Sequence, residues 1–435
     1  DLLPSYDDVN LFVEPASFLS KVKSKQDSYS FVDSVMATPL PTYGFDYSLV
    51  RNPDIDTAYN ALITYVIPGS PAAQAGLERG DWIMKVDTSY ISKKYETYLL
   101  QGTKAVKLTL GEWKEVEIED EEDGNEGGDG EDEGPMMEYR VVPIDDPVEM
   151  PAAQIVEDNP VHKYEIIESP VKKIRVGYLM YNSFTAGTKA EPEKYNNELR
   201  SVSQKFKEAG VQAVILDLRY NEGGSMDCVQ LLGTILTSAD RLGEPMAYLE
   251  YNDKNTDKDA TILFGTDREI NLNLHSLIAI TSGTTMGAPE MLIRSLFLED
   301  TYPIATVGSS TKGQNVATEQ FINEEFLWSV NPVVCTVYNS QHDTYGAISP
   351  ATDLKVSETT IAGSTNYSEF LPFGTFDKDG KSERLLKIAI GVLDGTYPPK
   401  DDETPEESTT QTRFKVEKSV SSPASRRFSS KGLRL

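Results

Sequence analysis

The sequence is poor in the residues that build disulfides and metal sites, since its 435 residues include two cysteines and three histidines. Cys228 and Cys335 lie in apolar or strand-like contexts, which favours buried free thiols over a disulfide or a metal site. The histidines, His162, His275 and His342, show no ligand spacing such as HExxH and no obvious Ser-His-Asp arrangement. We therefore predict no metal and no other cofactor.

Long apolar runs and an excess of basic charge are also missing. No run reaches the ~18 apolar residues of a membrane-spanning helix. The 69 acidic and 41 basic residues give a formal net charge of −28, which argues against nucleic acid as a partner, because binding phosphates needs a basic face. The hydrophobic fraction of 39% fits a globular protein, and the length allows roughly two or three domains.

The first part of the chain changes from a helical to a β pattern. Residues 1–40 contain a short helical pattern, with apolar side chains at Phe18, Leu19 and Val22. Residues 41–145 contain short β runs such as NALITYVI and DWIMKVD. Between these two runs, PGSPAAQAGLERG predicts a short helix that is capped by serine and ended by glycine.

Residues 146–400 alternate strands with helices. The segments 176–181, 213–219 and 277–282 are apolar runs typical of buried parallel strands, and helical patterns lie between and after them. This alternation predicts an α/β sheet with right-handed crossovers. Ligands of such sheets bind at the carboxyl ends of the strands, where the turns 221–224 and 283–288 fall.

Two further segments differ in composition from these domains. Residues 117–134 hold eleven acidic residues among eighteen, and we expect a solvated hairpin tip rather than a calcium loop, because the EF-hand spacing is absent. Residues 401–435 are rich in Ser, Thr and Pro and end in basic residues, which predicts a tail that is either docked or disordered.

Several motifs in a fixed order carry a family resemblance. YGFDYSL and PGSPAAQAGLERGDWIMKVD resemble parts of a PDZ domain. VGYLMYNSF, VILDLRYNEGG, ITSGTTMGAPEMLIRSL and VGSSTKGQNVAT resemble the carboxyl-terminal processing peptidases, the S41 serine peptidase family, and most closely the exported members from Bacteroides-like bacteria. The resemblance covers about residues 15–395. It implies a ClpP/crotonase-like α/β protease domain with an inserted or preceding PDZ domain, a Ser-Lys dyad, and an oxyanion hole of backbone N–H groups.

The resemblance places a glycine where the family has its nucleophile. The family's Ser lies three residues before a Glu, and here that segment reads TMGAPE, so the nucleophile position is Gly287, which has no side chain to attack a carbonyl carbon. The position of the Lys depends on the alignment. Residue spacing gives Lys312, whereas the motif T-x-G-K-N-V aligned on TKGQNV gives Gln314, and we favour the motif because its other positions match.

The remaining implied groups are backbone donors and nearby hydroxyls. The N–H of Ala288 and that of Gly223 or Gly224 correspond to the oxyanion hole. Ser282, Thr284 and Thr285 carry hydroxyls near the site that could replace the missing nucleophile. We expect them to be misplaced, because a shift of ~1 Å can reduce a rate by about 10²-fold.

The PDZ resemblance implies a peptide-binding loop at Tyr43, Gly44, Phe45, Asp46 and Tyr47. The N–H groups from Gly44 to Tyr47 should point into a groove that receives a polypeptide or its C-terminus as an added strand. The carboxylate of Asp46 would repel an incoming carboxylate.

Three hypotheses follow. The first is a catalytically silent S41 homologue that binds extended polypeptide or C-termini. The second is an active exported endopeptidase that uses a displaced hydroxyl with Lys312, or whose native Ser has been replaced in this sequence. The third is a scaffolding protein of the cell envelope, which would be favoured if both clefts held the chain's own segments.

The chain starts at Asp1 rather than Met, which fits a removed export signal or lipoprotein leader, or a boundary set within a longer chain. We therefore expect a protein of the periplasm or an outer-membrane lipoprotein, with membrane contact only through such an anchor.

Overall fold

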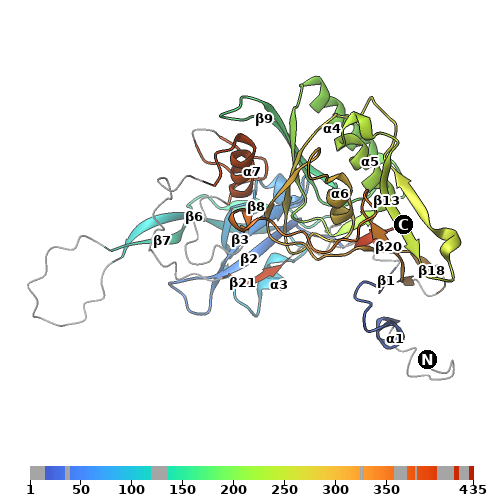
Figure 1. Ribbon diagram of the computed structural model, residues 1–435. Coiled ribbons are helices and arrows are strands. Elements are labelled where there is room, and N and C mark those ends of the chain that lie inside the picture. Colours follow the sequence, from blue (N-terminus) through green and yellow to red (C-terminus); the bar gives the residue numbers. More distant parts are fainter. Residues whose placement is uncertain are drawn as a thin grey trace, which may run out of the picture.

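The computed structural model describes residues 15–34, 40–118, 136–323, 325, 328–356, 370–377, 380–398, 416–420 and 431–435. The strands of these ranges form four sheets of three, five, six and eight strands. Among the helices in these ranges, none is long and apolar enough to cross a bilayer. Figure 1 shows the antiparallel sheet around β2 (Phe45–Arg51) and β3 (Tyr59–Val66) next to the body that carries the helices α4 (Lys194–Glu208), α5 (Met226–Leu236), α6 (Ala288–Leu296) and α7 (Arg384–Asp394).

The eight-stranded antiparallel sheet is built mainly from residues 45–150. Its order is β21-β2-β3-β4-β6-β7, with β5 beside β4 and β8 beside β6. The strands are β2 Phe45–Arg51, β3 Tyr59–Val66, β4 Trp82–Val86, β5 Ser89–Tyr90, β6 Val106–Ile118, β7 Met136–Pro143, β8 Val148–Met150 and β21 Val416–Val420. Two short helices accompany them, α2 Pro71–Gln74 and α3 Glu96–Leu100. Ser70 caps α2 by accepting the N–H of Ala73 at 3.2 Å, as the sequence predicted.

Strands β6 and β7 form a long hairpin that projects from the body (Figure 1). The last pair of this ladder joins Ile118 to Met136. The acidic segment 117–134 therefore starts at the end of β6. Its residues from 119 onward lie outside the described residues, so the solvated tip stays a prediction.

The five-stranded sheet has the order β16-β15-β11-β10-β9. Strands β10 Arg175–Tyr181, β11 Ala213–Asp217, β15 Leu277–Thr281 and β16 Ile304–Gly308 are parallel, and β9 Val161–Glu168 is an antiparallel edge strand. The helices are α4 Lys194–Glu208, α5 Met226–Leu236, α6 Ala288–Leu296 and α7 Arg384–Asp394. Both faces of the sheet are covered. Leu179 and Leu216 pack in a core with α4, α5 and α6, whereas Tyr178 and Ile215 pack in a core with α7.

The six-stranded sheet has the order β12-β22-β17-β20-β13-β14. Its strands are β12 Gly223–Ser225, β13 Pro245–Tyr251, β14 Ala260–Leu263, β17 Val316–Thr318, β20 Val333–Tyr338 and β22 Gly432–Arg434. Both cysteines are free and buried, Cys228 in α5 and Cys335 in β20, as predicted. Short 3₁₀ turns occupy Ala239–Arg241, Thr256–Lys258 and Thr352–Leu354.

The N-terminal residues contribute a strand as well as a helix. The helical pattern forms α1 Pro15–Val22, and β1 Phe31–Ser34 follows it. Strand β1 pairs with β19 Trp328–Asn331, which in turn pairs with β18 Phe321–Asn323. This small sheet joins the first described residues to a segment about 300 positions away, a pairing that local periodicity does not indicate.

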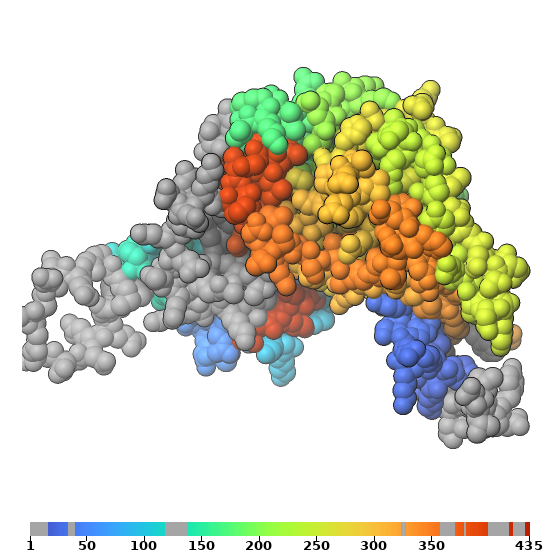
Figure 2. All heavy atoms as spheres, in the orientation of Figure 1, coloured from blue at the N-terminus to red at the C-terminus, as the bar shows by residue number. Residues whose placement is uncertain are grey.

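The described parts of the tail are docked. Strand β21 extends the antiparallel sheet at β2, and β22 lies between β12 and β17. Figure 2 shows the atoms of β21 in red at the surface, beside the blue and cyan atoms of the antiparallel sheet. We call β21 and β22 the tail strands.

Candidate active-site cleft

The predicted nucleophile position lies at the start of a helix. Gly287 immediately precedes α6 with φ 71° and ψ −101°, a left-handed conformation that favours glycine. Its N–H donates to Oε2 of Glu290 at 2.8 Å. A Cβ added at Gly287 would lie closer than 3.0 Å to the carbonyl carbon of Gly432 and to the nitrogen of Leu433. The space that a serine side chain would need is thus occupied by the backbone of β22.

Glu290 connects this helix start to the loop after β16. Its side chain is fully buried and accepts the N–H of Gly313 at 2.5 Å, the N–H of Gln314 at 2.9 Å and the hydroxyl of Thr311. With the N–H of Gly287, four donors converge on one carboxylate. The motif identifies Glu290 only by its distance from Gly287 and does not indicate this role. An acidic residue at the third position of a helix is the signal for such a cap.

The two candidate Lys positions lie in different environments. The Gln314 side chain is 1% exposed, and its Nε2 donates to the carbonyl of Val316 at 2.9 Å. Its Oε1 has no hydrogen-bond partner among the described residues, and a Cβ added at Gly432 would lie 2.5 Å from it. Lys312 is exposed, and its N–H donates to the carbonyl of Thr285 at 3.0 Å. The structure therefore places Gln314, and not Lys312, beside Gly432, whose backbone also lies next to Gly287.

The implied oxyanion-hole glycines meet the same tail strand. Gly223 pairs with Gly432 and Gly224 with Leu433. The N–H of Gly223 already donates to Oδ1 of Asn221 at 3.0 Å. Ala288 is the first residue of α6. The structure thus gathers these backbone groups around β22, which covers them.

The three hydroxyls near the site brace the turn after β15. Thr285 donates to the carbonyl of Leu218 at 2.9 Å, and Thr284 donates to that of Arg219 at 3.0 Å. The hydroxyl of Ser282 also donates to the carbonyl of Arg219. Each hydroxyl proton is therefore engaged by a main-chain oxygen.

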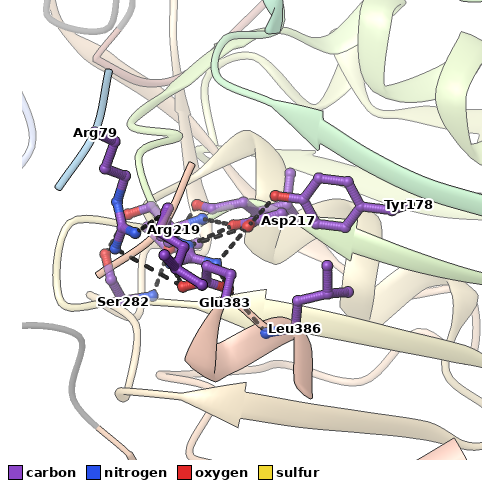
Figure 3. A network of polar contacts seen from close by, with 10 residues as sticks. Arg79, Tyr178, Asp217, Arg219, Ser282, Glu383 and Leu386 are labelled. Atoms are coloured by element: carbon purple, nitrogen blue, oxygen red, sulfur yellow. Dashed lines mark hydrogen bonds and ion pairs between the residues drawn. The ribbon is translucent and has the colours of Figure 1, made fainter. Parts of the chain in front are cut away.

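A buried ion-pair network lies beneath this turn (Figure 3). Arg219, from the end of β11, donates to Asp217 at 2.7 Å and to Glu383, just before α7, at 2.9 Å. Arg79, which precedes β4 in the antiparallel sheet, lies 3.8 Å from Glu383. Burial opposes ionisation of Glu383, but the guanidinium of Arg219, helped by Arg79, lowers its pKa to about 2. The network ties the two main sheets and the turn at Ser282 together.

The histidines take no part in this site. The ring of His162 stacks on Tyr65 with centroids 4.5 Å apart, and burial lowers the pKa of His162 to about 3. His342 lies 2.8 Å from Glu250 and stacks on Tyr248. His275 is exposed.

The predicted peptide-binding loop is largely internal to the antiparallel sheet. The rings of Tyr43, Phe45 and Tyr47 are buried in its core, and Asp46 pairs with Tyr65 of β3. The N–H of Gly44 donates to the hydroxyl of Thr42 at 3.1 Å. The sequence predicted that a peptide ligand would add a strand at this sheet edge. In the structure the added strand is β21 of the same chain, which pairs with residues Tyr47 to Val50 of β2.

Comparison with known proteins identifies the family. Residues 175–330 match the family model of peptidase family S41, and residues 62–109 match that of a PDZ domain. A crystal structure described as "Putative S41 protease" from Bacteroides fragilis NCTC 9343 shares 38% sequence identity and a TM-score of 0.76, over 91% of this chain and 92% of that one. This chain belongs to the S41 peptidase family. The predicted fold, an α/β peptidase domain with a PDZ domain, is confirmed.

Another similar structure is described as a photosystem II D1 C-terminal processing protease. It shares 16% identity with a TM-score of 0.41, over 79% of this chain and 81% of that one. No curated protein matches the sequence. The PDZ match begins at residue 62, yet β2 and the tail strand β21 complete the same sheet.

Proposed function

We propose that this chain is a catalytically silent S41 peptidase homologue that binds extended polypeptide. The observation that carries the proposal is the nucleophile position, where Gly287 offers no side chain and contacts the backbone of an extended segment. In serine peptidases, loss of the nucleophile reduces kcat by roughly six orders of magnitude, equivalent to about 8 kcal/mol of transition-state stabilisation. The backbone donors of an oxyanion hole alone do not replace that transition-state stabilisation.

The general base is missing as well. The amide of Gln314 is not basic enough to take a proton from an attacking hydroxyl, whereas the family's Lys amine is. The hydroxyls of Ser282, Thr284 and Thr285 donate to main-chain carbonyls, and Lys312 lies on the surface. These contacts argue against a displaced dyad.

The features needed for binding polypeptide are retained. Strands β12 and β17 flank a gap that one extended segment fills by main-chain pairing, and β2 offers a second edge of the same kind. Strand addition of this sort supplies affinity through the main chain and selectivity through side-chain pockets.

A second candidate is a scaffolding protein in which neither cleft accepts a foreign peptide. The tail strands favour it, because β21 and β22 fill both clefts.

For either candidate we propose export to the periplasm or the outer membrane, which rests on the resemblance to exported members of the family. Cell fractionation tests the location.

Incubation of the purified chain with casein and with unfolded peptides tests the silent state. We expect no hydrolysis above the buffer control. Cleavage that is lost on Thr285→Ala or Lys312→Ala would establish a displaced dyad and overturn the proposal. A third variant, Lys107→Ala on the PDZ sheet, controls for effects of removing a surface charge.

A further inference from the structure

The gap between β12 and β17 is filled by a segment that pairs on both of its sides. Strand β22 runs parallel to β12, with Gly224 opposite Leu433, and parallel to β17, with Ala317 opposite Leu433. Further bonds flank the strand. The N–H of Gly432 donates to the carbonyl of Glu222 at 2.6 Å, and the N–H of Leu435 donates to that of Thr318 at 3.0 Å. The segment therefore binds as an inserted strand.

The central side chain of this segment is fully buried. Leu433 is 0% exposed and packs in the core that α5 and α6 share with the peptidase sheet. Two residues later, Leu435 is 38% exposed. Leu433, the residue that follows the glycine, thus occupies an apolar pocket of the cleft.

Three glycines meet where β22 crosses the former nucleophile. A Cβ at Gly223 or Gly287 would collide with the backbone of Gly432. Gly432 itself has φ +72°, and a Cβ there would lie 2.5 Å from Oε1 of Gln314. A serine at position 287 is therefore incompatible with this occupant. The space that a serine side chain would need at position 287 is therefore the space that the backbone of β22 fills.

The second tail strand occupies the PDZ groove between β2 and α3. Strand β21 pairs antiparallel with β2, and the hydroxyls of Ser48 and Ser419 are 2.8 Å apart. Lys418 forms an ion pair with Glu96 of α3, whose side chain is 3% exposed. The same short stretch of chain thus reaches both peptide sites.

The charge of this stretch complements the rest of the molecule. Residues 411–435 contain seven basic residues and one acidic residue, whereas the whole chain has a net charge of −28. At the cleft, the charges of Lys431 and Lys312 act on Glu222. Attraction between a basic segment and an acidic body favours docking of the segment onto its own chain.

We propose that the cleft is a binding site for extended peptides with a glycine–apolar sequence and that residues 432–434, Gly-Leu-Arg, are its resident ligand. This inference rests on the proposed function, because it takes the cleft to bind rather than to cleave. A foreign peptide of this class enters only when β22 leaves. The tail strands therefore control access to both peptide sites.

The test measures binding of a fluorescein-labelled Ser-Lys-Gly-Leu-Arg-Leu peptide, the sequence of residues 430–435, by fluorescence anisotropy. Leu433→Asp places a carboxylate in the apolar pocket and should expel β22, whereas Leu435→Asp makes the same change at an exposed site. We expect the Leu433→Asp chain to bind the peptide at least about tenfold more tightly than the unmodified chain, and the Leu435→Asp chain to match the unmodified one. A labelled peptide with Asp in place of its first Leu should not bind.

Because Leu433 belongs to the core, a second variant keeps the test decisive if Leu433→Asp does not fold. Replacing residues 421–430 with a recognition site for a sequence-specific protease lets the chain fold with β22 in place. Cutting and dilution should then release residues 431–435 and expose the cleft. Equal peptide binding before and after cutting would overturn the inference, as would equal binding by the folded Leu433→Asp and Leu435→Asp chains.

The casein assay separates this inference from the proposed function. Hydrolysis by the unmodified chain refutes the silent homologue, whatever the peptide does. Equal and measurable peptide binding before and after cutting, in a chain that remains inactive, refutes only the role of β22. Absence of peptide binding in both states refutes that role as well and favours the scaffolding candidate.

Discussion

At the scale of single residues, Gly287 has a structural role beside the loss of a nucleophile that we propose for its position. Its positive φ and its contact with the backbone of Gly432 mean that a glycine is required while β22 is in place. Under the proposed function, replacing Gly287 with Ser and Gln314 with Lys would restore the two catalytic side chains that the family resemblance implies. The space for the new serine, however, is taken. The two changes alone are therefore not sufficient for activity.

We expect the Gly287→Ser, Gln314→Lys double variant to show no casein hydrolysis above background. Adding Leu433→Asp, which expels β22, should produce measurable cleavage, because a serine hydroxyl, a Lys base and the N–H of Ala288 then face an open cleft. Hydrolysis is followed by release of labelled peptides. The matched control is Gly287→Ala in place of Gly287→Ser. Activity of the double variant with β22 still bound would contradict the steric argument.

The sequence predicted Gly287 as the nucleophile position, but it did not indicate why a glycine suits the local structure there. The motif around Gly287 is local, so an alignment of a few residues finds it. The collision with Gly432 joins positions about 145 apart in the chain, and no local pattern encodes it. The Glu290 cap lies between these cases. Its place at the third position of the helix follows from the local sequence, whereas its partners from the loop at 311–314 do not.

At the scale of elements, the buried network connects β11, α7 and the PDZ sheet. Arg219 has 0% side-chain exposure and lies between two carboxylates, while Arg79 reaches Glu383 from the other sheet. Burial raises the pKa of Asp217, whereas the nearby guanidinium groups hold the pKa of Glu383 low. Glu383 also caps α7 by accepting the N–H of Leu386 at 2.9 Å. One carboxylate therefore serves an ion pair and a helix start.

We expect Glu383→Gln to lower the free energy of unfolding by about 3–5 kcal/mol, because it leaves two guanidinium groups buried with less negative charge to balance them. Urea unfolding at neutral pH measures the change. The exposed pair of Lys163 and Glu165, 2.7 Å apart, supplies the control, and Glu165→Gln should cost no more than about 1 kcal/mol. A loss below about 1 kcal/mol for Glu383→Gln would show that the network is not a structural link.

The strands and helices that the sequence indicated are those with long, local patterns. The apolar runs at 176–181, 213–219 and 277–282 became β10, β11 and β15, because strands buried on both faces are apolar throughout. The short strands β21 and β22 were missed. A segment such as Gly-Leu-Arg has no periodicity, and only its tertiary pairing makes it a strand.

At the scale of the whole molecule, the tail strands link the PDZ sheet to the peptidase cleft. Ten residues, 421–430, separate β21 from Lys431. Strand β21 pairs with β2, whereas β22 pairs with β12 and β17, so the two tail strands are held by different strands. Displacing one tail strand should therefore leave the other strand docked. The two proposed peptide sites can then open one at a time.

Charge reversal at Lys418 tests whether the tail strands act separately. Lys418→Glu places a carboxylate against the buried Glu96, so β21 should leave β2. We expect amide hydrogen exchange to become at least about tenfold faster at 47–50, with no change at 316–318, because β22 keeps its own main-chain bonds and its buried Leu433. Lys107→Glu, at an exposed pair on β6 of the same sheet, should leave both regions unchanged. Faster exchange at both sites would mean instead that the tail strands dock as one cooperative unit, and that a ligand of the PDZ groove opens the peptidase cleft.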